Sequence, residues 1–205
     1  MRDKEGLKGL GVIVVGVAAY GVVVNTALLF AMMAPLYLLS GPVRGSLGIV
    51  TYSIEAFGRT YYSPALDMAS FLSIIVITSS TLNVAAGLAV TYLTLKRKEP
   101  HIIATEALMA SSLTLLISLG TLSGIRRIIT YELARLTRSY SFTSTAGAVQ
   151  VYSVHAHALP AATILRGETY LLLTIPYTLA TVVSYALVLR NAGRAEVLKK
   201  ESLKE

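Results

Sequence analysis

The sequence predicts an all-α integral membrane protein with four transmembrane helices, built as two duplicated helical hairpins with a small extracytoplasmic cap of strands and loops. Of its 205 residues, 54% are apolar and only 14% are charged, whereas about a quarter of an ordinary soluble domain is charged. Four uncharged runs each extend over at least 19 residues, and about 20 apolar helical residues cross a hydrocarbon core about 30 Å thick. A short string near residue 51 also recurs near residue 151.

The predicted elements form one membrane domain, residues 1–205. The spans are 9–39, 67–95, 101–125 and 169–189, the outer segments are 40–66 and 126–168, and the cytoplasmic tail is 190–205. A cleaved signal peptide is the rival interpretation of the first span, but this apolar run is far longer than the roughly 7 to 15 residues of a signal peptide. Pro35 and Pro176 are expected to kink the first and fourth spans.

The third helix is expected to be followed by a further helical stretch. In the segment "IRRIITYELARLTRSY", Ile125, Ile129, Leu133 and Leu136 recur at helical spacing, and arginines fall on the other side. This stretch either continues the helix out of the bilayer to residue 139 or lies flat on the membrane surface.

Both outer segments contain the recurring string, "TYSIEAF" at 51–57 and "VYSVHAH" at 151–157. Each copy lies between an outgoing and a returning helix, so we interpret the chain as two hairpins in a parallel repeat, with chance similarity as the alternative. The β-branched and aromatic residues of both strings predict one strand in each. The two strands are expected to pair with each other over the outer ends of the helices.

The basic residues predict that both termini are cytoplasmic. One side of the predicted membrane carries 11 of the 18 Lys and Arg residues, including all seven Lys, and such an excess is typical of the cytoplasmic side. These clusters flank membrane spans, so we expect them to bind anionic lipid headgroups and not nucleic acid, although the net charge is +7. The sequence therefore predicts a multi-pass protein of the cell membrane.

Cofactor and metal chemistry has few candidates. Cysteine is absent, which excludes disulfides and thiolate metal sites. The absence of cysteine and the scarcity of Asn and Gln also predict a thermophilic, archaeal source. No cofactor is expected, since the only histidine of a predicted span, His101, lies at its cytoplasmic start and no histidine lies deeper in the membrane to hold a haem. His155 and His157 would lie on one face of a strand and could share a metal ion, with Glu55 or Glu168 as a third ligand.

Polar side chains near the middle of the first two spans are candidates for an intramembrane site. Asn25 lies in the first span, and Ser79, Ser80 and Asn83 lie in the second. Polar groups in lipid need partners, so we expect hydrogen bonds between helices. The alternative is a polar path for water, an ion or a solute.

Glu106 is the acidic candidate within the third span. Charged residues in spans are often functional, but Glu106 lies near the inner boundary, where Lys96, Arg97 or Lys98 can reach it. Structural pairing is therefore the favoured interpretation, and a proton or ion site is the alternative.

Tyrosine and glycine residues are candidates for contacts with lipid or protein. The outer tyrosines fit either an aromatic belt at the headgroup level or a protein interface: Tyr52, Tyr61, Tyr62 and Tyr152. Gly120 and Gly124 form a small-xxx-small pair, which predicts close contact between helices.

The function predicted from these observations is non-enzymatic. The chain lacks a phosphate-binding glycine loop, an HExxH motif, a Gly-x-Ser-x-Gly motif and paired carboxylates. We expect a membrane subunit or scaffold that assembles with itself or with a larger membrane complex through its helices and outer cap. The alternative is a small oligomeric channel or transporter with a path along Asn25 and Asn83.

Overall fold

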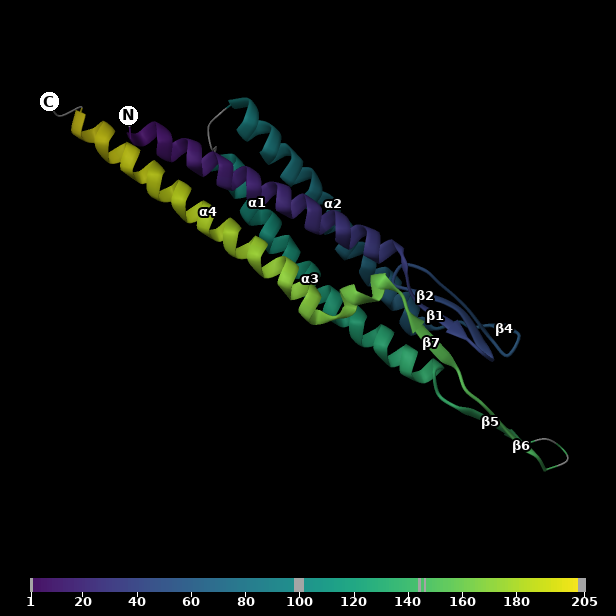
Figure 1. The fold of residues 1–205 in the computed structure, drawn as a ribbon. Coiled ribbons are helices and arrows are strands. Elements are labelled where there is room, and N and C mark those ends of the chain that lie inside the picture. Colours follow the sequence, from purple (N-terminus) through teal and green to yellow (C-terminus); the bar gives the residue numbers. More distant parts are fainter. Residues whose placement is uncertain (1, 98–101, 144, 146, 203–205) are drawn as a thin grey trace. The chain divides into compact units, whose positions relative to one another are not determined.

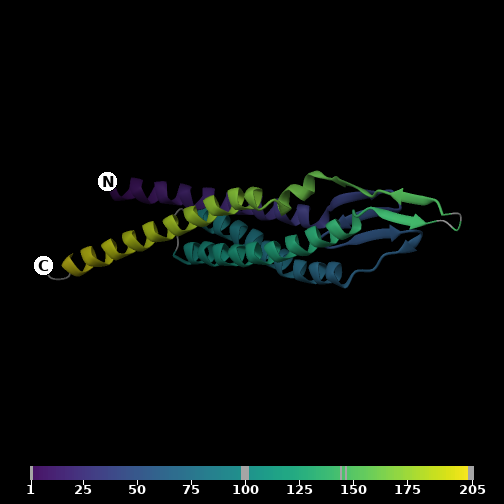
Figure 2. The same ribbon diagram turned by 90° about the horizontal axis from the view of Figure 1, so that it is seen from below.

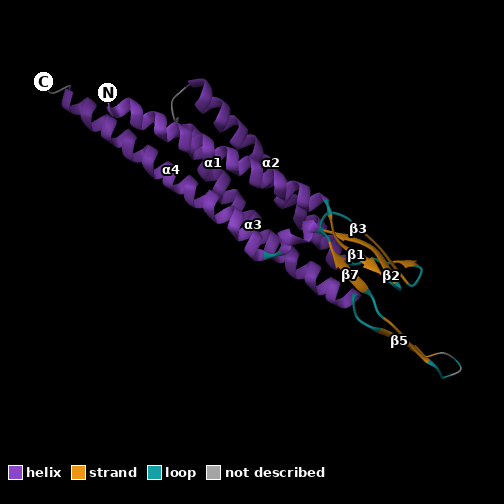
Figure 3. Ribbon diagram, viewed as in Figure 1, coloured by secondary structure: helices purple, strands orange, loops and turns teal. Residues whose placement is uncertain are grey.

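The described chain consists of four long α-helices, two antiparallel β-sheets and one short 3-10 helix (Figures 1 and 3). The computed structural model describes residues 2–97, 102–143, 145 and 147–202, with the backbone alone at 2–8, 10, 97, 102–104, 167, 170, 173, 188 and 191–202. The helices are α1 (Arg2–Met33), α2 (Pro64–Arg97), α3 (Ile102–Leu136), α4 (Gly167–Ser202) and the 3-10 helix η1 (Pro160–Leu165).

The larger sheet combines strands from both outer segments. Its order is β4 (Arg59–Thr60), β3 (Tyr52–Ala56), β2 (Val43–Gly48), β1 (Pro35–Ser40) and β7 (His155–Ala158). Strand β7 lies beside β1, as Figure 1 shows, and Leu38 is paired with His157 in the register of the two strands. The second sheet is a ribbon of β5 (Tyr140–Thr143) and β6 (Val149–Tyr152).

The chain folds as two compact units, and long helices contribute residues to both. The helical unit comprises Met1–Thr26, Ser79–Ile117 and Leu171–Glu205, and the sheet unit comprises Ala27–Thr78 and Ser118–Tyr170. Within the helical unit, the N-terminal end of α1 and the C-terminal end of α4 lie at the same end (Figures 1 and 2).

Three of the described helices are long and apolar enough to cross a membrane. The qualifying segments are Gly11–Met33 in α1, Pro64–Lys96 in α2 and Thr105–Leu136 in α3, and α4 carries a shorter apolar stretch, Thr174–Leu187. The protein is therefore mostly helical, with three candidate membrane helices and a small sheet.

The first helix ends earlier than predicted. It stops at Met33, and Pro35 begins strand β1, so the predicted span to residue 39 and the predicted kink at Pro35 are wrong. Proline fixes its own φ, lacks an N–H group and disfavours helical geometry at the preceding residue. The amide of Ala34 still donates to the carbonyl of Phe30 at 3.1 Å, which closes the last turn. Pro176, in contrast, lies inside the continuous helix α4.

The two recurring strings do not pair with each other. The first string forms β3, which pairs with β2 and β4, whereas the second is split between β6 and β7. Strand β6 pairs with β5, and β7 pairs with β1. The predicted pairing is wrong because each string pairs with another strand that the fold brings next to it. Strand β3 follows β2 in a hairpin. The second string passes close to the turn between β1 and β2 before the chain enters β7.

Gly41 permits that close passage. It has a φ of 117°, and a Cβ atom at this position would lie 2.8 Å from the carbonyl oxygen of Ser153. Only glycine accommodates both the left-handed backbone and the nearby carbonyl without strain.

The core of the sheet unit joins the strands to the helices. Leu36, Leu47 and Ile54 from the sheet pack in one cluster with Ile125 and Ile129 from α3. Helix α3 continues without interruption to Leu136, so the stretch after residue 125 extends the third helix and contributes its apolar side to this core.

Candidate functional sites

A buried chain of hydrogen bonds connects three helices of the helical unit. The Asn83 amide nitrogen donates to the Asn25 Oδ1 atom at 3.3 Å, and the Thr114 hydroxyl donates to the Asn83 Oδ1 atom at 2.6 Å. The Asn25 amide nitrogen also donates to the carbonyl of Gly21 at 2.8 Å. Asn25 and Asn83 are 0% and 3% exposed, so their side chains bond to protein groups as the sequence predicts.

A second bond connects α3 to α4 in the same unit. The Ser111 hydroxyl lies 2.8 Å from the Tyr177 hydroxyl, and both side chains are buried. Gly21 makes room for this tyrosine, because a Cβ atom at Gly21 would lie 2.5 Å from the Tyr177 ring. The glycine of α1 is therefore required for the tyrosine of α4 to reach its partner.

The interior of the helical unit is unusually polar. Among its described residues, eight buried side chains are apolar and eleven are polar and uncharged. The polar ones are Asn25, Ser79, Ser80, Asn83, Thr94, Thr105, Ser111, Ser112, Thr174, Thr181 and Ser184. The predicted Ser79 and Ser80 belong to this set, and the Ser80 hydroxyl and the Thr94 hydroxyl are buried without a hydrogen-bond partner.

Glu106 does not pair with Lys96. It lines an apolar cavity of about 370 Å³ between described residues of α3 and α4. The Lys96 ammonium group instead donates to the Tyr92 hydroxyl at 3.0 Å and lies over its ring, so the predicted pairing with Lys96 is wrong. The Arg97 side chain and Lys98 lie outside the described residues.

His155 and His157 lie in β7 with both side chains exposed. The predicted third ligand Glu55 is in β3, three strand spacings away in the sheet order, which is about 14 Å. Its carboxylate is held by Arg44 at 2.9 Å. Among the described residues, no group of three or more His, Cys, Asp or Glu residues lies together, so the sheet does not provide Glu55 as the third ligand.

Two tyrosine–carboxylate pairs lie in the sheet unit. The Tyr52 hydroxyl donates to Asp67 at 3.0 Å, and the Tyr61 hydroxyl donates to Glu132 at 2.9 Å. Glu132 is only 1% exposed, and Arg135 approaches its other oxygen at 3.7 Å. Burial and then the bonded carboxylate raise the pKa of Tyr61 above 10.0. Both tyrosine hydroxyls therefore form hydrogen bonds within the chain.

The remaining predicted interface residues are exposed or have free space beside them within the described chain. Tyr62 is 76% exposed and Tyr152 is 40% exposed. No heavy atom of the chain outside the local helix lies within 4 Å of a Cβ atom placed on Gly120 or Gly124. The glycine pair therefore makes no close helix contact within the described chain, and a contact with another protein stays a prediction.

Sequence reasoning missed two polar groups on buried helix faces. Glu132 continues the helical spacing of the buried Ile125 and Ile129, and Tyr177 interrupts the apolar run of α4. In both cases the sequence shows a polar residue at a helix position that faces the interior. The neighbours that bond to them belong to distant segments and could not be found from local spacing.

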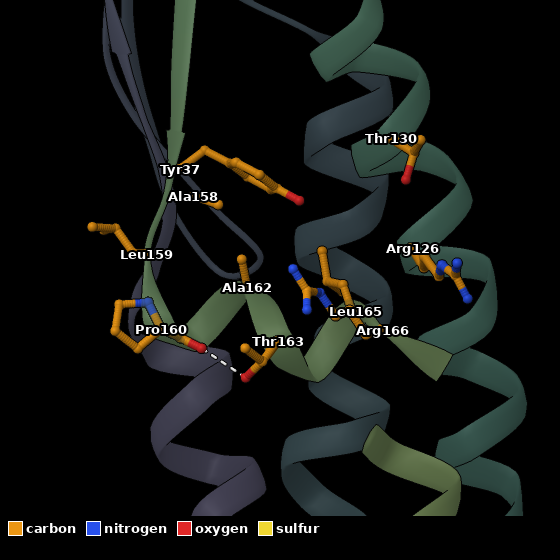
Figure 4. Close-up of a pocket in the computed structure, with 10 residues that line it drawn as sticks. All are labelled: Tyr37, Arg126, Thr130, Ala158, Leu159, Pro160, Ala162, Thr163, Leu165 and Arg166. Carbon is orange, nitrogen blue, oxygen red and sulfur yellow. Dashed lines mark hydrogen bonds between the residues drawn. The ribbon is translucent and has the colours of Figure 1, made fainter. Parts of the chain in front are cut away.

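An arginine-lined cavity lies in the sheet unit between β1, the β7–η1 segment and α3. Its volume is about 460 Å³, and Tyr37, Arg126, Thr130, Thr163 and Arg166 supply its polar groups. Figure 4 shows the Tyr37 and Thr130 hydroxyls directed toward the space, with Arg166 on the η1 side and Arg126 on α3, its guanidinium turned away from Tyr37. None of the described residues that line this cavity is acidic.

Comparisons with known proteins do not assign this chain to a group. No protein-family model, no curated protein and no solved structure matches it. The buried hydrogen-bond network, the exposed strands and the arginine-lined cavity are therefore the features that bear on function.

Proposed function

We propose that this protein is a non-enzymatic, four-span membrane subunit that assembles with further copies of itself through the β5–β6 ribbon. In the proposed arrangement the four long helices cross the lipid bilayer, the strands lie outside the cytoplasm, and both termini are cytoplasmic. The polar interior of the helical unit supports the membrane location, because polar groups in lipid must bond to one another inside the bundle.

The side chains of α4 support a fourth span. Four polar or aromatic residues recur on one buried face: Thr174, Tyr177, Thr181 and Ser184. The opposite surface exposes apolar side chains to the surroundings: Leu172, Ile175, Leu179, Val182 and Val183. Such a helix hides its polar side and presents its apolar side, as a lipid-facing helix does.

One exposed face of the β5–β6 ribbon supports the proposed assembly. Cross-strand pairing places Ser141, Thr143, Val149 and Val151 on one face. Val149 is 61% exposed and Val151 is 67% exposed. A two-stranded ribbon is marginally stable alone, so an apolar partner on this face would stabilise it.

The other face of the ribbon contacts an aromatic side chain of the larger sheet. Phe57, in the turn after β3, packs its ring 5.2 Å from the Tyr140 ring and 5.1 Å from the Phe142 ring. The aromatic side therefore attaches the ribbon to the larger sheet, and the valine face is left for another molecule.

A second copy is the partner that fits this face. Residues 139–165 contain no Asp, Glu, Lys or Arg, so two copies can bring the same face together without like-charge repulsion. Contact of one face with itself about a two-fold axis is the commonest geometry of homo-oligomers.

Native mass spectrometry of the full chain released from detergent micelles tests the proposal. We expect a dimer or larger oligomer for the wild type and a monomer for Val151→Lys, because an ammonium group would be buried at the contact. Gln150→Lys places the same charge on the opposite face of β6 and should leave the oligomer intact. A monomeric wild type, or an oligomer that survives Val151→Lys, would contradict the proposal.

The channel alternative is tested separately by ion flux in liposomes. The amides of Asn25 and Asn83 bond to each other and to protein groups, which supports a structural role for them. Flux through the wild-type protein that is abolished by Asn83→Leu would favour the channel.

A further inference from the structure

The arginine-lined cavity of the sheet unit has uncompensated positive charge. Arg126 and Arg166 form no ion pair among the described residues, whereas Arg44 and Arg135 of the same unit are bound to Glu55 and Glu132. With no acidic side chain among the described residues of its lining, the cavity attracts anions. Guanidinium groups bind phosphate with paired hydrogen bonds.

Two neutral donors accompany the arginines. The Tyr37 and Thr130 hydroxyls line the cavity and have no hydrogen-bond partner within the described chain, and both are directed into the space (Figure 4). The Thr163 hydroxyl already donates to the carbonyl of Pro160 at 2.7 Å. A volume of about 460 Å³ lies in the range of small-molecule sites, so it holds a phosphate and the group attached to it.

The sequence position of the arginines matches the level of lipid headgroups. Arg126 directly follows the uncharged run 107–125, which as a helix is about 28 Å long, close to the thickness of the hydrocarbon core. Arg166 lies just before the uncharged run 169–189. This placement depends on the proposed membrane arrangement, whereas the charge and the donors of the cavity do not.

We propose that this cavity binds a phosphate group, with Arg166 as the principal contact, the Tyr37 and Thr130 hydroxyls as further donors, and Arg126 turning in from its outward orientation on α3. The phosphate is that of an anionic lipid headgroup or a soluble phosphate. Both present the same negatively charged oxygens to the site.

Two measurements on the full chain in nanodiscs distinguish the sources. In the first, discs of phosphatidylcholine with phosphatidylglycerol are prepared, and native mass spectrometry records which lipid stays bound. In the second, inorganic phosphate is titrated by calorimetry into protein held in phosphatidylcholine discs. Retention of phosphatidylglycerol indicates the lipid source, and phosphate binding in neutral discs indicates the soluble source.

Variants test the residues. Arg166→Gln should weaken binding about tenfold, the usual effect of losing a charge-assisted hydrogen bond, and the double variant with Arg126→Gln should abolish it. Arg59→Gln removes an exposed arginine of β4 outside the cavity and serves as the charge-matched control. Binding of neither probe, or an equal loss in Arg59→Gln, would overturn the proposal. The oligomeric state, read in the same spectra, reports on the proposed assembly independently.

Discussion

The helical unit and the sheet unit have opposite interiors. Among the described residues, the helical unit buries eleven polar and eight apolar side chains, whereas the sheet unit buries four polar and nineteen apolar ones. An apolar interior is usual for a protein that folds in water, where apolar burial drives folding. A polar interior fits the proposed membrane location of the helical unit, because polar groups in lipid bond to one another inside a bundle.

The two units also use polar residues of different kinds. The buried side-chain hydrogen bonds described in the helical unit join uncharged groups, such as Asn25 with Asn83 and Ser111 with Tyr177. The sheet unit uses ionisable groups, as in the bonds of Tyr52 to Asp67 and Tyr61 to Glu132. Charges cost far more than amides or hydroxyls in hydrocarbon, so this difference supports the proposal that the helical unit lies in lipid.

The largest effect is expected from truncation in the apolar core of the sheet unit. Leu36 of β1 is 0% exposed, and Leu36→Ala should lower the free energy of unfolding by about 2–5 kcal/mol through lost burial and a cavity. Leu38→Ala, on the exposed face of the same strand, should change it by less than about 0.5 kcal/mol. Hydrogen exchange of sheet amides, followed by mass spectrometry, measures both. Equal effects would contradict the apolar-core assignment.

A lysine on the outer surface distinguishes the solvents directly. Leu113 is 61% exposed in the helical unit, and Leu113→Lys should disfavour membrane insertion by about 2.5–3.5 kcal/mol. Tyr62→Lys, at a 76% exposed position of the sheet unit, should insert normally. An in-vitro translocon assay that scores inserted helices compares them, and normal insertion of Leu113→Lys would break the comparison.

A smaller loss is expected from the polar network. Asn83→Leu removes the partner of Asn25 and Thr114, and interhelical hydrogen bonds in membrane proteins contribute about 0.6–2 kcal/mol. Thermal unfolding in nanodiscs should show this decrease, while Leu82→Ala, at a neighbouring exposed position, should show little. A larger loss of stability for Asn83→Leu than for Leu36→Ala would contradict the expectation that the apolar core contributes more to stability than the polar network.

The smallest effect concerns alkaline pH in the sheet unit. The native pKa of Tyr61 is raised above 10.0 by burial and by Glu132, so the native state holds this proton more tightly than the unfolded state. The contribution is complete below pH 10 and is lost as pH rises through the native pKa. Tyr61→Phe should therefore reduce the loss of stability between pH 9 and pH 11, measured by hydrogen exchange and corrected for its intrinsic rate. If Tyr61→Phe loses as much stability between pH 9 and pH 11 as the wild type, the Tyr61–Glu132 pair does not make this contribution.

Local patterns predicted the long helices but not their ends or partners. The uncharged runs identified the apolar parts of α1, α2 and α3, and the helical spacing after Ile125 indicated the extension to Leu136. The end of α1 was missed because apolar residues continue into β1 and the effect of Pro35 was treated as a kink. The partners of Glu132 and Tyr177 lie far away in sequence, at Tyr61 and Ser111.

The sequence by itself determined that most of the chain is helical and apolar, because hydropathy and helical periodicity are local properties of each segment. It also determined which polar residues would have to be satisfied inside. Only the tertiary structure decided that Asn25 meets Asn83, that β7 joins β1, and that Arg126 and Arg166 line one cavity. Such pairings depend on which segments approach each other in space, and that follows from the packing of the whole chain.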